Sequence, residues 1–310
     1  MNSIERARIF SEEKIQELRA KLAAEIGPGA NVVTCGSFAR RDASRASDLD
    51  YFCVFPGEEK GRTSNPAIRD IVMDVIGKAP SEGGAFAKDV TERQLLTNIG
   101  GWDDDNENIT RRILYLLEGE YLTDRKEFEA IRANLIEQYV GNTPNDHQIA
   151  FYLLNDIVRY WRTMAVDYAH KTSQLGPSKP WGVRNLKLVY SRKLIYASGI
   201  FSVALTADRS EVQKCEILQT LFAMTPIERL QYVCGITATT RLFEIYAFFL
   251  DKIEDKNFRS RIDSLKPEDK HTDEEFRSLK NEGHYFSREL MALLQSTFHA
   301  SHPIHMSLIF

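Results

Sequence analysis

Two aspartates, Asp48 and Asp50, are separated by one residue at the start of the apolar run "DLDYFCVF". Side chains of a strand alternate between its faces, so we expect both carboxylates on the same side of one strand, about 7 Å apart. Carboxylates held that close repel each other unless a cation lies between them. Hard oxygen ligands suit Mg²⁺, which also shares its coordination shell with phosphate oxygens. The pair therefore predicts a site for a metal-bound phosphate.

A Gly-Ser pair, Gly36 and Ser37, lies upstream, where the apolar run "NVVTC" gives way to a polar segment. If a helix begins there, its backbone N–H groups would bind an anion, and glycine would allow a close backbone approach. An isolated Asp-x-Asp or Gly-Ser is common and usually marks a turn or a strand end. Their ordered combination, with ten residues between Ser37 and Asp48, is more specific and predicts a pocket for a metal-bound polyphosphate.

The elements that would position these residues alternate between helix and strand. A helix is expected over 11–26, with Ser11 as its N-cap, and another over 66–77. The runs "NVVTC" and "LDYFCVF" are expected to be strands, and "GGAFAKDV" at 83–90 a shorter third one. Such alternation is typical of a layer of helices on a sheet.

After residue 107 the apolar residues follow helical spacing, and no further strand is predicted. The expected helices beyond residue 180 cover 182–204, 209–223, 226–253 and 274–298. The charge-dense segment 254–275 is expected to be a solvated connection. We therefore predict an α+β protein, in which a small mixed β-sheet domain with helices at 1–106 precedes an all-helical domain at 107–310.

Composition narrows the classes of protein. The 310 residues carry a net charge of −4 and a pI near 6.0, so no global basic field attracts nucleic acid. The four cysteines show no metal-ligand spacing and stand in apolar surroundings, which favours a reducing cytoplasm. No apolar run is long enough to span a bilayer and no signal-peptide core is present, so we expect a cytoplasmic protein without a membrane partner.

The segment "GSFARRDASRASDLDYFCVF" resembles the nucleotidyltransferases of the DNA polymerase β superfamily, whose Gly-Gly or Gly-Ser after the first strand precedes an acidic pair on the next. "LLTNIGGWDDDNENITRRILYLLEGEYLTDRKEFEAIR" is similar to a segment of the uridylyltransferase domain of bacterial PII-uridylyltransferase and of relatives with a helical C-terminal domain. We expect no His-Asp phosphohydrolase domain and no ACT or CBS module here, so PII is not implied as the substrate.

The resemblance implies that Asp48 and Asp50 hold two Mg²⁺ ions and that Gly36 and Ser37 seat the triphosphate of an NTP. A third carboxylate often completes such a site from a neighbouring strand. Asp89 in "GAFAKDV" is the best candidate, although a solvent-exposed aspartate at a strand end would look the same, and Glu92 is the nearest substitute.

Three basic residues are further nucleotide-binding candidates. Arg40 lies one turn beyond Ser37 and offers a planar fork of donors for phosphate oxygens, whereas the next arginine, Arg41, is expected in a surface salt bridge. Arg184 and Lys187 begin a polar stripe that Ser191 continues at helical spacing. A solvated helix face would explain the stripe equally well.

The resemblance implies an enzyme that moves a nucleoside monophosphate from an NTP to a hydroxyl group, with release of pyrophosphate. The acceptor is expected to be a protein or a small molecule. Because phosphate contacts need local basic density, the acidic pI disfavours tRNA as the acceptor, while synthesis of a signalling nucleotide stays open. The alternative is a catalytically weak nucleotide-sensing or partner-binding module, which the presence of both aspartates disfavours.

Overall fold

The computed structural model describes residues 1–25, 31–56, 66–80, 89–97, 99–100, 104–141, 145–172 and 180–308. The chain divides into two compact units. The sheet unit comprises Glu5–Asn145 and Arg209–Thr225, and the helical unit comprises Met1–Ile4, Asp146–Asp208 and Pro226–Phe310.

The sheet unit contains a four-stranded mixed sheet in the order β3-β2-β1-β4. β1 and β2 pair antiparallel, with Cys35 opposite Asp50, and β4 pairs antiparallel with β1. β3 runs parallel to β2, with Val54 beside Val90. The strands are β1 (Asn31–Cys35), β2 (Asp50–Phe55), β3 (Val90–Thr91) and β4 (Glu120–Tyr121).

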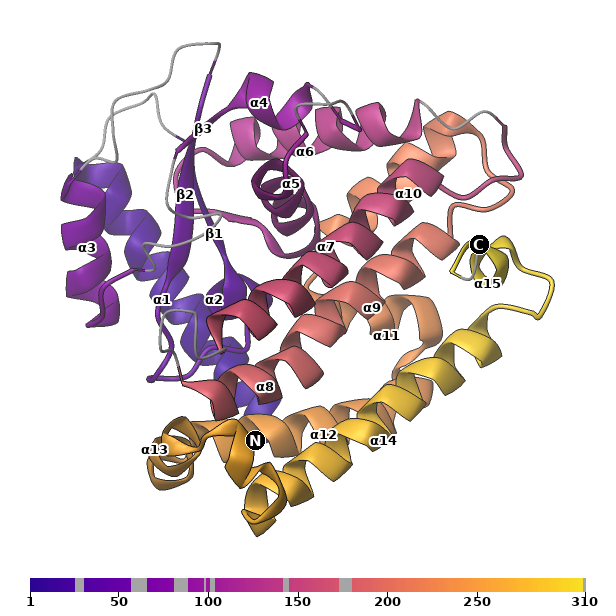
Figure 1. Ribbon diagram of the computed structural model, residues 1–310. Coiled ribbons are helices and arrows are strands. Elements are labelled where there is room, and N and C mark those ends of the chain that lie inside the picture. The colour runs from indigo at the N-terminus through magenta and orange to yellow at the C-terminus, as the bar shows by residue number, and fades with distance from the viewer. Residues whose placement is uncertain are drawn as a thin grey trace. The chain divides into compact units, whose positions relative to one another are not determined.

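Helices cover this sheet, with α1 and α3 on one side and α5 and α6 on the other (Figure 1). The helices of the sheet unit are α1 (Ser3–Glu25), α2 (Gly36–Arg40), α3 (Pro66–Ile76), α4 (Glu92–Leu96), α5 (Asn106–Glu118), α6 (Arg125–Val140) and α10 (Glu211–Phe222). The first residues of α1 are counted with the helical unit.

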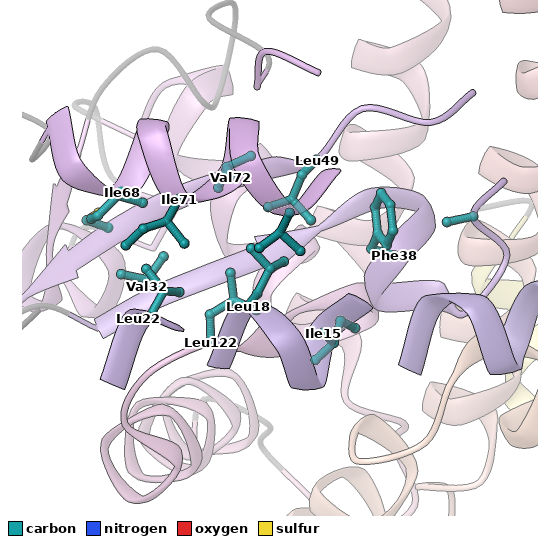
Figure 2. Close-up of a cluster of buried hydrophobic side chains, with 13 residues drawn as sticks. Ile15, Leu18, Leu22, Val32, Phe38, Leu49, Ile68, Ile71, Val72 and Leu122 are labelled. Atoms are coloured by element: carbon teal, nitrogen blue, oxygen red, sulfur yellow. The ribbon is translucent and has the colours of Figure 1, made fainter. Parts of the chain in front are cut away.

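A buried hydrophobic cluster lies between the sheet and the helices α1 and α3 (Figure 2). Ile15, Leu18 and Leu22 recur at helical spacing on one face of α1 and are fully buried. They meet Val32 of β1 and Leu49, which directly precedes β2. The cluster thus holds the chain on both sides of the two predicted aspartates.

The described residues of the helical unit are mostly helical. Its elements are α7 (Phe151–Lys171), α8 (Trp181–Val189), α9 (Ser191–Ala204), α11 (Pro226–Cys234), α12 (Ile236–Glu254), α13 (Lys256–Ser264), the 3₁₀ helix η2 (Pro267–His271), α14 (Glu274–Thr297) and α15 (Pro303–Ser307). None of the helices that the structure describes combines the length and apolar character needed to cross a membrane.

The α+β prediction is confirmed, and several details of it are corrected. Ser11 does not cap the first helix, which already begins at Ser3; its hydroxyl lies within α1 and donates to the Ala7 carbonyl. The charged segment 254–275 contains α13 and η2 rather than an open connection. β4 was not expected, because its two residues carry no strand pattern.

The predicted domain boundary at 106/107 stays a prediction, and the two compact units describe how the chain packs. Helices α5 and α6 belong with the sheet, and the sheet unit continues to Asn145 and takes in α10. Of the predicted third strand at 83–90, only residues 89 and 90 lie among the described residues, and Val90 begins β3.

Candidate active site

Gly36 and Asp50 are in direct contact. Gly36 begins α2 with a φ of +79°, a left-handed conformation that favours glycine. A Cβ placed on it would lie 2.8 Å from Oδ2 of Asp50, so the carboxylate occupies the space that any other side chain would need. The pairing of Cys35 with Asp50 across β1 and β2 creates this approach. The two halves of the sequence motif therefore meet at one point.

Helix α2 is short and firmly held. Phe38 is buried in the cluster and packs against Phe10 of α1, with ring centroids 6.1 Å apart. The helix ends at Arg40, and Arg41 after it adopts a φ of 66° and donates its backbone N–H to the Phe38 carbonyl. The next residue, Asp42, donates its N–H to the Ser37 carbonyl at 2.9 Å. These bonds turn the chain back toward the sheet immediately after the Gly-Ser pair.

The serine-rich loop between α2 and β2 is tied down by hydrogen bonds. The Ala43 N–H donates to the Ser11 hydroxyl of α1 at 3.2 Å, and Ser44 and Ser47 close a small turn on each other. Lys78 donates to the Ala46 carbonyl at 2.6 Å. These hydrogen bonds therefore fix the position of the loop that leads to Asp48 and Asp50.

Leu49 determines the direction of both aspartates. Its side chain is fully buried in the cluster of Figure 2, whereas Asp48 is exposed and Asp50 is half-buried. Because neighbouring side chains of an extended segment point to opposite sides, the two carboxylates share the side away from the cluster. β2 begins at Asp50, so Asp48 precedes the strand rather than lying within it.

Arg40 makes ion pairs inside the protein. Its Nε and Nη2 donate to the two oxygens of Asp42 at 3.0 and 3.1 Å, and its Nη1 donates to Glu118 of α5 at 2.6 Å. All three side chains are nearly buried. These ion pairs brace α2 against α5, and the contact of Arg40 with phosphate stays a prediction. Sequence reasoning missed Glu118, which lies 78 residues away and has no local signal.

The face of the sheet that carries Asp50 also receives Glu118. Burial, followed by the negative charges of Glu118 and Asp50, raises the pKa of the Cys35 thiol well above its ordinary value. The negative charges of Glu118 and Asp50 therefore both raise the pKa of the same buried thiol. Arg41 forms the expected ion pair, donating to Glu120 at 2.7 Å.

Asp89 lies next to Cys53 of β2. Burial, then the charge of Asp89 and a hydrogen bond with it, raise the pKa of the Cys53 thiol. Cys53 belongs to the buried cluster, and it lies three residues from Asp50 along β2, so the two side chains point to opposite faces. The role of Asp89 as a third carboxylate stays a prediction. The substitute, Glu92, begins α4 and contributes to the raised pKa of Glu127, after burial and Asp124.

Arg184 and Lys187 lie on α8, which belongs to the helical unit, and both are half-buried. Ser191 does not continue their stripe toward solvent, because it is buried and its hydroxyl accepts a hydrogen bond from Tyr246 at 3.1 Å. The role of Arg184 and Lys187 at a triphosphate stays a prediction.

The donor set fits Mg²⁺ in type. Across the described ranges, no group of three or more His, Cys, Asp or Glu side chains is arranged to hold a metal ion. Mg²⁺, however, is usually bound through one or two carboxylates plus substrate phosphates and water rather than by an all-protein cage. Asp48 and Asp50, on the same side of the backbone, supply that number of carboxylates.

Residues 15–116 match the family model described as a nucleotidyltransferase domain. The matched range begins within α1 and ends within α5, and it includes Gly36, Ser37, Asp48 and Asp50. The narrower resemblance to the uridylyltransferase domain of PII-uridylyltransferase stays a prediction. No curated protein matches the sequence of the chain.

Proposed function

We propose a reaction for this enzyme, which contains a nucleotidyltransferase domain of the kind found in the polymerase β superfamily. It transfers the monophosphate of an NTP to a hydroxyl group of a protein or a small molecule, with Mg²⁺, and releases pyrophosphate. The observation that carries this proposal is the contact of the Asp50 carboxylate with Gly36. It joins the acidic pair to the Gly-Ser pair, as a metal-bound phosphate requires.

In this proposal Asp48 and Asp50 hold two Mg²⁺ ions, which would neutralise phosphate charge and lower the pKa of the acceptor hydroxyl. Gly36 lets the triphosphate approach the backbone next to Asp50, and Ser37, half-buried beside it, orients that end of the ligand. Arg40 acts through α2, which it holds in place with Glu118, and is a positioning residue.

Three assignments remain part of the proposal. Asp89 is retained as the proposed third carboxylate, and its charge also raises the pKa of the Cys53 thiol. Arg184 and Lys187 are retained as contacts of the triphosphate or of the acceptor, since both carry positive charge on one helix.

The acceptor is proposed to be a protein or a small molecule rather than nucleic acid. The net charge of −4 disfavours tRNA as the acceptor, although it does not exclude local patches of basic residues. Synthesis of a signalling nucleotide stays open. A catalytically weak nucleotide-sensing module would keep the fold but would not need both aspartates on the side away from the core. The orientation that Leu49 imposes on them favours the enzyme.

The direct test is nucleotide transfer by the full chain. Protein, Mg²⁺ and each α-labelled NTP are incubated with cell lysate, and the labelled molecule is identified. Asp48→Asn and Asp50→Asn should each abolish labelling, because either change removes a metal ligand. Asp89→Asn tests the proposed third carboxylate and should lower labelling as well.

Thermal melts in EDTA show whether a variant loses labelling because it lacks a metal ligand or because it is less stable. Without metal, the two carboxylates repel each other, so we expect neither Asp48→Asn nor Asp50→Asn to lower the melting temperature. Near-normal labelling by either variant would reject the proposed metal site. Labelling by none of the four NTPs, together with saturable NTP binding, would support the sensing module.

A further inference from the structure

Two lysines in the helical unit are held by neutral groups only. Lys193 of α9 donates to the hydroxyl of Ser287 on α14 at 2.6 Å. Lys280 of α14 donates to the side-chain carbonyl of Asn185 on α8 at 2.7 Å. In the part of the chain that the structure describes, neither ammonium has a carboxylate within ion-pair distance, although ion pairs are frequent elsewhere in the protein. Two positive charges are therefore left without compensation.

The two ammonium groups lie near each other. Burial, followed by the positive charge of Lys193, lowers the pKa of Lys280, and burial lowers the pKa of Lys193. Both side chains are half-buried, so each has lost part of its hydration while remaining accessible. Glu282 of α14 raises the pKa of Tyr190 after burial, but it forms no ion pair with either lysine. Partly buried like charges destabilise a fold unless an anion lies between them.

The neutral partners of the lysines are themselves fixed. The Ser287 hydroxyl donates to the Gly283 carbonyl at 2.9 Å, so it offers Lys193 an acceptor lone pair. The Asn185 amide nitrogen donates to the hydroxyl of Tyr168 on α7 at 2.7 Å, so its carbonyl faces Lys280. Each ammonium carries three N–H groups and uses one in these bonds. The remaining donors of both lysines are available to a bound molecule.

The backbone brings these helices close enough to form one site. Gly283 lies between Lys280 and Ser287 on α14, and a Cβ placed there would overlap Val189 and come within 3.4 Å of the Tyr190 ring. The α8–α9 junction thus packs directly onto α14 within the helical unit (Figure 1). Side chains that flank this contact on α8, α9 and α14 are therefore held on one framework.

We propose that Lys193 and Lys280, held by Ser287 and Asn185, form an anion site that takes a phosphate group. A phosphate ester carries a charge near −2 and several acceptor oxygens, which matches two uncompensated ammoniums. Lysine binds phosphate as a compact point charge, without the fixed fork of arginine. The group belongs either to the triphosphate of an NTP or to a separate phosphorylated ligand. If the group is the triphosphate of the substrate NTP, the inference rests on the proposed transfer reaction; if it belongs to a separate ligand, it does not.

The first experiment measures binding of orthophosphate, pyrophosphate and each NTP to the full chain by calorimetry, at low ionic strength and then at higher salt. Lys193→Gln and Lys280→Gln should each weaken binding of the preferred anion roughly tenfold or more, since each removes a charge-assisted hydrogen bond. Lys256→Gln is the matched control, because Lys256 is an exposed lysine of the same unit. Lys193→Arg should keep most of the affinity.

The probes distinguish the two sources of phosphate. If the site takes the triphosphate, both Gln variants weaken NTP and pyrophosphate binding together. If it takes a separate phosphorylated ligand, they weaken orthophosphate binding and leave NTP binding unchanged. In either case Asp50→Asn should retain the orthophosphate affinity of the wild type, so a failure of the proposed transfer reaction would not be mistaken for a failure of this site. Absence of saturable binding to wild type, or equal binding by the Gln variants, would overturn the proposal.

A second measurement needs no variant. Lysines of the wild-type chain are acetylated briefly with and without the preferred anion, and each site is quantified by mass spectrometry. Bound phosphate should slow acetylation of Lys193 and Lys280 and leave that of Lys256 unchanged. If the lysines serve only to join helices through Ser287 and Asn185, the anion will protect neither of them, and the proposal is wrong.

Discussion

The substitution Gly36→Ala tests the contact on which the proposed active site depends. It has two separate effects, because Gly36 combines a φ of +79° with a neighbouring Asp50 Oδ2 at 2.8 Å from the added Cβ. The first effect is backbone strain, which costs about 1–2 kcal/mol for an L-residue in the left-handed region. The second is a clash that the Asp50 carboxylate can relieve only by moving away.

Gly77 provides the matched control. Its φ is +73°, yet a Cβ placed on it meets nothing within 4 Å. Gly77→Ala therefore carries the strain without the clash. Because a carboxylate rotates at modest cost, we expect the two alanine variants to lose similar stability, each about 1–2 kcal/mol. Their activities should differ, since a catalytic group displaced by about 1 Å can lower a rate roughly a hundredfold.

The assay pairs urea unfolding with the initial rate of label transfer from the α-labelled NTP. Gly36→Ala should transfer label about a hundredfold more slowly than Gly77→Ala at equal stability. Repeating both unfolding measurements in an Asp50→Ala background removes the clash, and the two glycine substitutions should then cost the same within about 0.5 kcal/mol.

Equal transfer rates for Gly36→Ala and Gly77→Ala would refute the reasoning. That result would mean that the position of the Asp50 carboxylate against Gly36 does not matter for the reaction, and the two halves of the motif would not form one site. A loss of stability confined to Gly36→Ala, with normal activity, would lead to the same conclusion.

Two further predictions concern Arg40 and the cysteines. Arg40→Met should destabilise the protein by about 3–5 kcal/mol, because it leaves Glu118 buried without its cation. Arg41→Met should cost about 1 kcal/mol. Urea unfolding measures both losses, and equal losses would contradict the bracing role of Arg40. At neutral pH, iodoacetamide should modify Cys215 in the native protein and Cys35 only after unfolding, because Cys35 is fully buried and its pKa is raised well above the ordinary value. Mass spectrometry detects the modified residue. Modification of Cys35 before unfolding would mean that β1 is exposed, which would contradict the structure.

The strands were predictable where burial and local chemistry agree. The run "NVVTC" coincides with β1, and "LDYFCVF" begins one residue before β2. In both, the β-branched or aromatic residues pack on a sheet, so local pattern and tertiary environment point to the same structure. β4 could not be predicted, because its two residues become a strand only through pairing with β1.

Helix ends were predictable only in part. The expected helix 182–204 divides at Tyr190, whose ring stacks on Phe249 at 4.3 Å and whose hydroxyl donates to the Leu279 carbonyl. Those contacts come from distant helices and leave the local periodicity unbroken. The division of 226–253 at Gly235, by contrast, has a local signal, because its φ of +91° favours glycine.

The high charge of one segment made its helix, α13, hard to predict. The segment 254–275 is dense in charged residues, but Asp255 accepts hydrogen bonds from the N–H groups of Asn257 and Phe258 and so caps α13. Phe258 and Ile262, four residues apart, are buried. A capping aspartate followed by an apolar pair at that spacing indicates a helix even in a charged setting.

The difference between the aspartates and the other predicted site residues has a physical cause. The direction of Asp48 and Asp50 follows from Leu49 alone, since a leucine that must enter the core turns both neighbours the other way. The role of Arg40 depends on Glu118, a residue distant in sequence, and that of Asp89 depends on the register by which β3 joins β2. A site residue is therefore predictable when its orientation follows from the burial of its immediate neighbour. It is not predictable when the orientation depends on which distant element supplies its partner.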